Sequence, residues 1–160
     1  MPSSRPAETL LIEGADARAF AHAQFSSDVR ALAVGAWQFS AWLDAQGRVR
    51  TLFHLARLDE DRLLLLLRGG QAAALGDALR RFVFRSRVKL HASCAQVLAT
   101  GDALPLHVTH MSRRGIALGA GTHSLLINHD GDGDEHWCAP QREAGWPWLP
   151  ALTLDSLLPP

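Results

Sequence analysis

Four side chains that can form hydrogen bonds lie close together near the start of the chain: Gln24, Ser26, Ser27 and Asp28. Such a group can hold the polar edge of a bound ligand, or it can satisfy the free backbone amides at a helix end. The two serines have no histidine and aspartate partners in a recognisable arrangement, so we do not predict nucleophilic catalysis or any catalytic residue.

The elements that position this group are predicted from apolar spacing and turn residues. Residues 9–12 are typical of a strand, Gly14 of a sharp turn, and residues 16–24 of a helix opened by an aspartate. Residues 37–43 and 49–58 then form two apolar runs around a loop that ends in glycine, which predicts a hairpin with that glycine, at position 47, in a positive-φ conformation.

The following segments complete one α+β unit. Residues 62–68 contain unbroken leucines, which predicts a strand buried on both faces. Residues 71–84 have helical spacing, and residues 87–98 return to a strand. We therefore expect an antiparallel sheet with packed helices, a βαβββαβ core, as a domain over residues 7–99. Residues 100–160 are expected to be a shortened or truncated second segment with a small irregular β extension.

Composition limits the classes of function. The net charge is zero, from 16 basic and 16 acidic residues, which argues against a broadly basic nucleic-acid surface. The two cysteines, Cys94 and Cys138, are too few for a disulfide framework and lack the spacing of a zinc site, which fits reduced thiols. No long apolar stretch suggests a signal peptide or a membrane span. We expect a cytoplasmic protein without a membrane partner.

The ordered motifs resemble a known family. Residues 12–29 contain I-x-G-x-D-A-x-x-F-x-x-x-Q-x-S-x-D-V, residues 44–48 D-A-Q-G-R, and residues 84–88 F-R-S-R-V. Near the end, Trp137 precedes E-A-G at 143–145. Together they resemble the YgfZ branch of the GcvT-like folate-binding proteins, relatives of the glycine-cleavage aminomethyltransferase. The match is strong over residues 9–99 and moderate over residues 135–160, and it is poor between them.

The resemblance implies a ligand and a role. It implies tetrahydrofolate or another folate, with Trp137 stacking on the ring system and Gln24 and Asp28 at its polar edge. Arg85 or Arg87 would bind the anionic tail. It also implies an accessory protein for iron–sulfur cluster maintenance and tRNA modification. Its partners would include iron–sulfur proteins, and tRNA only indirectly or weakly.

Two departures from the family leave other functions open. The K-G-C-Y-x-G-Q-[DE] segment with the family's reactive cysteine is missing, so we expect a fragment of a longer protein rather than a naturally short relative. The strand at 49–52 lacks the carboxylate that aminomethyltransferases place near the folate amine. Its absence argues against an enzyme, although an aminomethyltransferase relative and a ligand-free interaction module stay as alternatives.

Simpler structural roles compete with each candidate residue. Asp28 is at least as typical of a helix cap or turn as of a ligand contact. Arg85, Arg87 and Lys89 would share one face of a strand, where they could bind a folate tail or RNA phosphate but are expected to be solvated. The aspartates in 130–134 imitate half a calcium loop without its glycine or final glutamate, so we predict a solvated turn and no metal.

Overall fold

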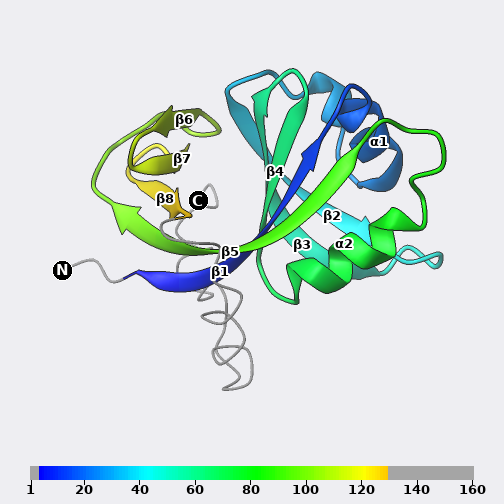
Figure 1. Cartoon of the computed structure of the whole chain (residues 1–160). Coiled ribbons are helices and arrows are strands. Elements are labelled where there is room, and N and C mark those ends of the chain that lie inside the picture. Colours follow the sequence, from blue (N-terminus) through cyan, green and yellow to red (C-terminus); the bar gives the residue numbers. More distant parts are fainter. Residues whose placement is uncertain (1–3, 130–160) are drawn as a thin grey trace.

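The computed structural model describes residues 4–129; Trp137, Cys138 and the aspartates of 130–134 lie outside this range. The described residues form an eight-stranded sheet with two α-helices and one short 3-10 turn (Figure 1). The strands are β1 (Arg5–Glu13), β2 (Ala36–Leu43), β3 (Val49–Asp59), β4 (Arg62–Leu67), β5 (Lys89–Thr100), β6 (Thr109–Ser112), β7 (Gly115–Gly119) and β8 (Ser124–Asn128). The helices are α1 (Ala17–Gln24) and α2 (Ala72–Arg80), and the 3-10 turn η1 is Val29–Ala31.

The sheet is antiparallel and bent into a half-barrel. Its strand order is β2-β3-β4-β1-β5-β8-β7-β6, and the long strands β1 and β5 join the part that carries the helices to the β6–β8 part (Figure 1). The two ends of the sheet meet, because the Trp37 N–H donates to the His107 carbonyl at 2.9 Å and the Thr109 N–H donates to the Gly35 carbonyl at 2.8 Å. The predicted antiparallel sheet with packed helices is confirmed at this level.

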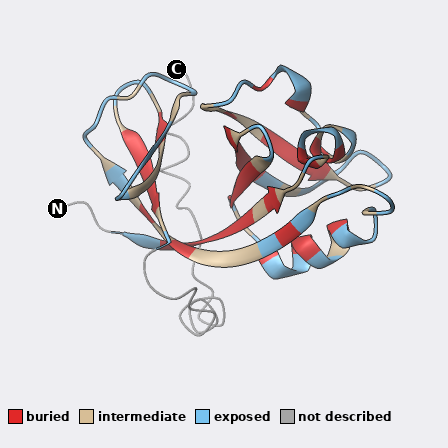
Figure 2. Ribbon diagram, turned by 45° about the horizontal axis from the view of Figure 1, so that its top comes forward, coloured by how far each residue is buried: buried red, intermediate tan, exposed pale blue. Residues whose placement is uncertain are grey.

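An apolar core lies on each face of the sheet. Leu63, Leu65 and Leu67 of β4 lie in the core beneath the helices, whereas Leu64 and Leu66 lie in the core inside the bend. All five are at most 3% exposed, so the prediction that this strand is buried on both faces is confirmed. Figure 2 shows the buried residues along the strands and on the inner side of the helices.

Two local contacts fix where the helices begin. Gly14 has φ of 137°, and a Cβ there would lie 2.0 Å from the Arg87 carbonyl oxygen, so the turn before α1 packs directly against the chain entering β5. The buried Glu8 carboxylate of β1 accepts a hydrogen bond from the Ala72 N–H at 2.7 Å. This bond satisfies a free amide in the first turn of α2 and attaches the helix to the centre of the sheet.

Two predicted boundaries are wrong, and both concern the segment between α2 and β5. The helix ends at Arg80 rather than at position 84, and turns closed by the Phe82 and Val83 amides follow it. The strand begins at Lys89 rather than 87. Arg87 instead exchanges backbone and side-chain bonds with Asp16: its N–H donates to the carboxylate at 2.7 Å, and its carbonyl accepts the Asp16 N–H. Since these groups are bonded to the α1 turn, they cannot join the sheet ladder.

Two other sequence expectations concern the hairpin and a membrane span. Gly47 has φ of 82°, as the predicted hairpin requires. In that hairpin the Arg48 N–H donates a hydrogen bond to the Asp44 carboxylate. This bond stabilises the ionised carboxylate and holds the pKa of Asp44 below its usual value. Within residues 4–129, no helix is long and apolar enough to cross a membrane.

Candidate functional site

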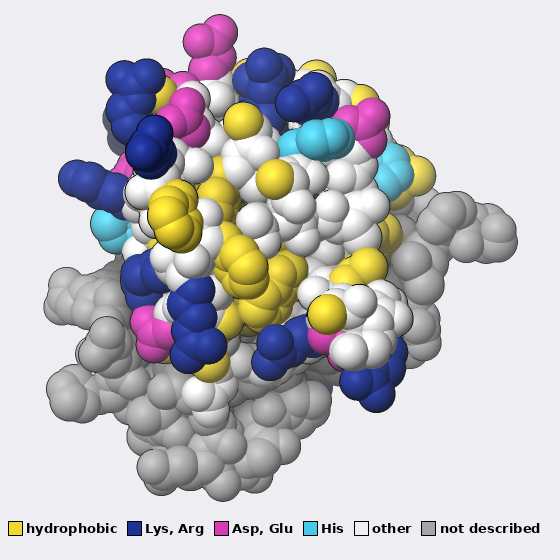
Figure 3. Space-filling view, turned by 90° about the vertical axis from the view of Figure 1, so that its right-hand side faces the viewer, with side chains coloured by type: hydrophobic (Ala, Val, Ile, Leu, Met, Phe, Trp, Pro, Cys, Tyr) yellow, Lys and Arg dark blue, Asp and Glu magenta, His cyan; other side chains and the backbone are white. Residues whose placement is uncertain are grey.

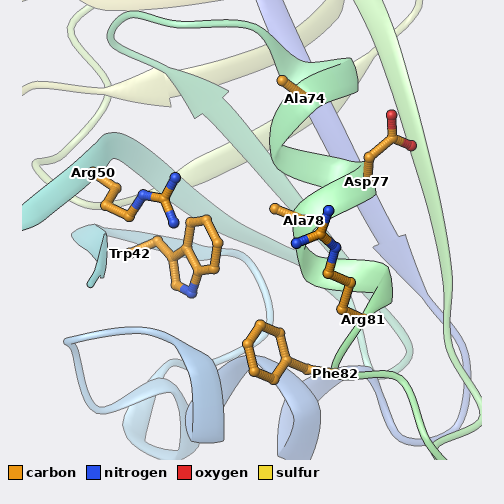
Figure 4. A pocket seen from close by; sticks show the side chains of 7 residues that line it. All are labelled: Trp42, Arg50, Ala74, Asp77, Ala78, Arg81 and Phe82. Atoms are coloured by element: carbon orange, nitrogen blue, oxygen red, sulfur yellow. The ribbon is translucent and has the colours of Figure 1, made fainter. Parts of the chain in front are cut away.

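A groove lies between the β2–β3 hairpin and one side of α2. Its volume is about 440 Å³, and it is lined by Trp42, Arg50, Ala74, Asp77, Ala78, Arg81 and Phe82 (Figure 4). On the face of the molecule shown in Figure 3, hydrophobic side chains gather with Lys and Arg side chains around them. The groove thus combines an apolar floor with a cationic border.

The aromatic floor is built by two elements. Trp42 of β2 is only 8% exposed and belongs to the core beneath the helices, so its ring is held firmly in place. The Phe82 ring, just beyond the end of α2, meets it edge to face at a centroid distance of 6.4 Å and is 51% exposed. An edge-to-face pair with one half-exposed ring leaves an aromatic surface against which a flat ring can stack.

The charges at the groove are unequal. The Arg50 guanidinium lies over the Trp42 ring, with its central carbon 5.0 Å from the ring centroid. On the opposite side, Asp77 comes from α2 and Arg81 from the residue that directly follows this helix (Figure 4). The Asp77 carboxylate already forms an ion pair with Arg80 at 2.5 Å, whereas no residue in 4–129 forms an ion pair with Arg50 or Arg81. The described groove therefore offers two guanidinium groups to an anionic ligand.

The polar turn predicted from the sequence lies directly beside this groove. Phe25 forms an isolated β-bridge with Trp42. The Ser26 N–H donates to the Ala41 carbonyl at 2.9 Å, and the Ala41 N–H donates to the Ser26 hydroxyl at 3.1 Å. These bonds attach the end of α1 to the strand that carries the tryptophan. Gln24 ends α1 half-buried, and its side chain has no hydrogen bond to another described residue.

Asp28 has a structural role in this turn. Its carboxylate accepts the Ala31 N–H at 3.3 Å and so caps η1, and it lies 3.5 Å from the His22 ring. The Ser27 hydroxyl is bonded within the same region, 2.6 Å from the Gln38 side-chain oxygen. A cap uses only part of the acceptor capacity of a carboxylate, and Asp28 is exposed, so a ligand contact stays a prediction.

The remaining predicted site residues lie apart from the turn. Arg85 and Arg87 are exposed in the connection between α2 and β5, and the Arg87 guanidinium is 3.8 Å from Asp16. No described contact joins either arginine to Gln24 or Asp28. The structure thus brings the glutamine turn next to the groove and leaves both arginines on the neighbouring connection.

Sequence reasoning missed the groove residues Trp42, Arg50 and Phe82. A signal was present, since Trp42 and Arg50 stand almost symmetrically about the hairpin at Gly47, which places them on paired strands. The predicted helix to position 84 concealed Phe82, because it would have put this ring on the buried side of α2.

A second hollow of about 330 Å³ lies on the other face of the sheet. Its polar lining includes Ser93 and His91, and its apolar lining includes Leu11 and Leu64. These polar groups bond to the protein itself: the Ser93 hydroxyl is 2.9 Å from that of Thr9, and His91 is 2.8 Å from the Glu13 carboxylate. Within residues 4–129, no group of three His, Cys, Asp or Glu side chains could hold a metal.

The bent antiparallel sheet with its two helices has the fold of the glycine-cleavage aminomethyltransferases. A crystal structure of glycine cleavage system aminomethyltransferase T from Bartonella henselae matches with a TM-score of 0.67 and 17% identity, over 88% of this chain and 44% of that one. At this identity the likeness concerns the fold.

A sequence relative gives a consistent span. An uncharacterized protein from Haemophilus influenzae is 26% identical over 153 residues, which is 92% of this chain and 54% of the relative. The chain therefore spans about half the length of each of these two proteins. No family model matches the sequence.

Proposed function

We propose that this chain binds a folate, with the groove beside Trp42 as its ring site. One observation supports this most directly: in an aminomethyltransferase-like fold, a firmly held tryptophan and a half-exposed phenylalanine border a groove with two guanidinium groups free of ion pairs among the described residues. Folates combine a flat heteroaromatic ring with carboxylates, so they match both features of the groove.

The residues divide the work in this proposal. The half-exposed Phe82 ring, held edge-on by the buried Trp42, offers the stacking surface, and Arg50 and Arg81 neutralise carboxylates. Gln24 supplies a side-chain amide that has no hydrogen bond to a described residue, suited to the hydrogen-bonding edge of the ring. Asp28, Trp137 and the arginines at 85 and 87 are proposed as further contacts, following the family resemblance.

The finer role follows the same resemblance. We place the chain with the YgfZ branch, as a cytoplasmic accessory protein for iron–sulfur cluster maintenance and tRNA modification, with residues 7–99 as a GcvT/YgfZ N-terminal-like domain. Thr51, which pairs with Trp42 across the hairpin, stands where a transferase would carry its carboxylate, and a hydroxyl cannot hold a proton in the same way. This favours binding over aminomethyl transfer.

The proposal is tested by calorimetric titration of the full chain with tetrahydrofolate and its polyglutamylated form. Arg50→Gln removes a guanidinium proposed to bind a folate carboxylate and should weaken binding roughly 10- to 150-fold, because a charge-assisted hydrogen bond contributes about 1.5–3 kcal/mol. Phe82→Ala should also weaken binding. The dissociation constant of Trp137→Ala tests separately whether Trp137 stacks on the folate ring, as the family resemblance implies.

Arg113→Gln is the matched control, since Arg113 lies exposed in the β6–β7 turn, outside the groove. It should leave the dissociation constant unchanged. Absence of saturable binding to the wild-type chain at millimolar ligand would contradict the proposal, as would equal weakening by Arg50→Gln and Arg113→Gln.

A further inference from the structure

The connection from α2 to β5 presents aromatic rings and cations together. Phe82 is 51% exposed and Phe84 is 92% exposed, the largest exposure among the large hydrophobic side chains of the described residues. Residues 78–101 contain no aspartate or glutamate. The cations around the two rings are Arg81, Arg85, Arg87 and Lys89, all exposed.

The outward position of Phe84 is fixed by its neighbours. Val83 and Val88, on either side, are partly buried and pack against the core beneath the helices. The Arg87 N–H is bonded to Asp16 at 2.7 Å, which attaches the end of this connection to the turn before α1. Because the connection is anchored at these points, the Phe84 ring is displayed to solvent from an ordered backbone.

The cations on this connection have little intramolecular compensation. Among residues 4–129, no acidic partner forms an ion pair with Arg81, Arg85 or Lys89. The Arg87 guanidinium reaches Asp16 only at 3.8 Å, and its side chain is 82% exposed. Exposed aromatic rings on a protein surface often mark a binding site. Because these rings lie among cations that have few acidic partners, they suit a ligand that has flat faces and regularly spaced negative charges.

We propose that this connection binds single-stranded nucleic acid. Bases stack on Phe84 and Phe82, and the backbone phosphates contact the arginines and Lys89. An acidic peptide would also carry negative charges that match these cations. Its apolar side chains, however, would need a pocket to bind in, whereas Phe84 protrudes from the surface. The zero net charge of the chain is compatible with such binding because the cations are concentrated in one segment without acids.

The test is fluorescence anisotropy of the full chain with a labelled oligouridine of roughly ten nucleotides at low salt, without folate. Phe84→Ala should weaken binding roughly 5- to 150-fold, since stacking contributes about 1–3 kcal/mol per base. Combined Arg81→Gln and Arg85→Gln should reduce the slope of log K against log salt by roughly 1.4, for two lost phosphate contacts.

The matched control is again Arg113→Gln, which should leave both affinity and salt slope unchanged. Circular dichroism and urea unfolding check that Phe84→Ala keeps the fold, as expected for a ring outside both cores. The proposal is overturned if the oligonucleotide does not bind, or if Phe84→Ala binds it as tightly as wild type. It is also overturned if polyglutamate displaces the oligonucleotide as well as unlabelled oligouridine does, since the surface would then select charge without bases.

Discussion

The Arg50 guanidinium lies over the Trp42 ring with 5.0 Å between its central carbon and the ring centroid. The two residues come from opposite strands of one hairpin, where Trp42 pairs with Thr51, the neighbour of Arg50. A cation over an indole at such a partly exposed position contributes about 0.5–1 kcal/mol. The main effect of this contact is to hold the long Arg50 side chain in one place. Its guanidinium thereby forms part of the groove wall and faces any anion that enters.

Asp28→Ala separates capping from ligand binding. Loss of the 3.3 Å bond to the Ala31 N–H should lower the free energy of unfolding by about 1 kcal/mol, measured by urea titration. If Asp28 also contacts folate as proposed, the dissociation constant for tetrahydrofolate changes as well. An unchanged constant in a destabilised variant would leave Asp28 as a cap alone.

Gly14→Ala should be severely destabilising. The added Cβ would lie 2.0 Å from the Arg87 carbonyl oxygen, at a backbone φ of 137° that alanine rarely adopts. We expect a loss of more than about 3 kcal/mol in urea unfolding, or no soluble protein. Gly47→Ala is the control: its φ is also positive, but nothing lies within 4 Å, so the loss should be roughly 1–2 kcal/mol. Equal losses would show that the close approach is unimportant.

Trp37→Phe tests how the half-barrel closes. The buried Trp37 indole N–H donates to the Gly119 carbonyl at 3.0 Å, and Trp37→Phe removes this bond while the His107 N–H still donates to the same carbonyl at 3.1 Å. The free energy of unfolding should fall by about 0.5–1.5 kcal/mol, the usual contribution of one hydrogen bond. Amide hydrogen exchange should also accelerate at Thr109, whose N–H bonds to Gly35 across the same junction. Unchanged exchange at Thr109 would mean that the junction does not depend on the indole.

His54 should make stability depend on pH. The ring is 1% exposed, packed against Trp37 and Phe39, and burial lowers the pKa of His54 from 6.5 to about 3. Between these two pKa values His54 binds a proton in the unfolded chain but not in the folded chain. The free energy of unfolding therefore falls as the pH decreases from about 6.5 towards 3. By pH 4.5 the loss from this one group should be roughly 2–3 kcal/mol.

The measurement is urea unfolding of wild type and His54→Leu at several pH values. The variant lacks the titrating ring, so the stability of wild type relative to His54→Leu should decline across this range. Carboxylates with lowered pKa, such as that of Asp59 bonded to Arg62, lose their contribution only at lower pH and in both proteins. A constant difference between the two proteins would contradict the assignment to His54.

Much of the fold follows from local sequence. The leucines of β4 and the glycine at position 47 gave a buried strand and a hairpin because burial and positive φ each restrict the choice of residue. The connection after α2 was mispredicted because Phe82 continues the helical spacing, while the bonds between Asp16 and Arg87 that hold this segment join residues far apart in sequence. The groove was missed for the same reason: Trp42 and Phe82 meet only through tertiary packing.

The measurement that tests folate binding most directly is a ¹⁵N NMR titration of the full chain with tetrahydrofolate. We expect saturable shifts of the Trp42 indole and the Arg50 side-chain signals, together with the amides of Ala78, Arg81 and Phe82 around the groove. Saturable shifts confined to the β6–β8 strands, or an unchanged spectrum at millimolar ligand, would contradict a folate site beside Trp42.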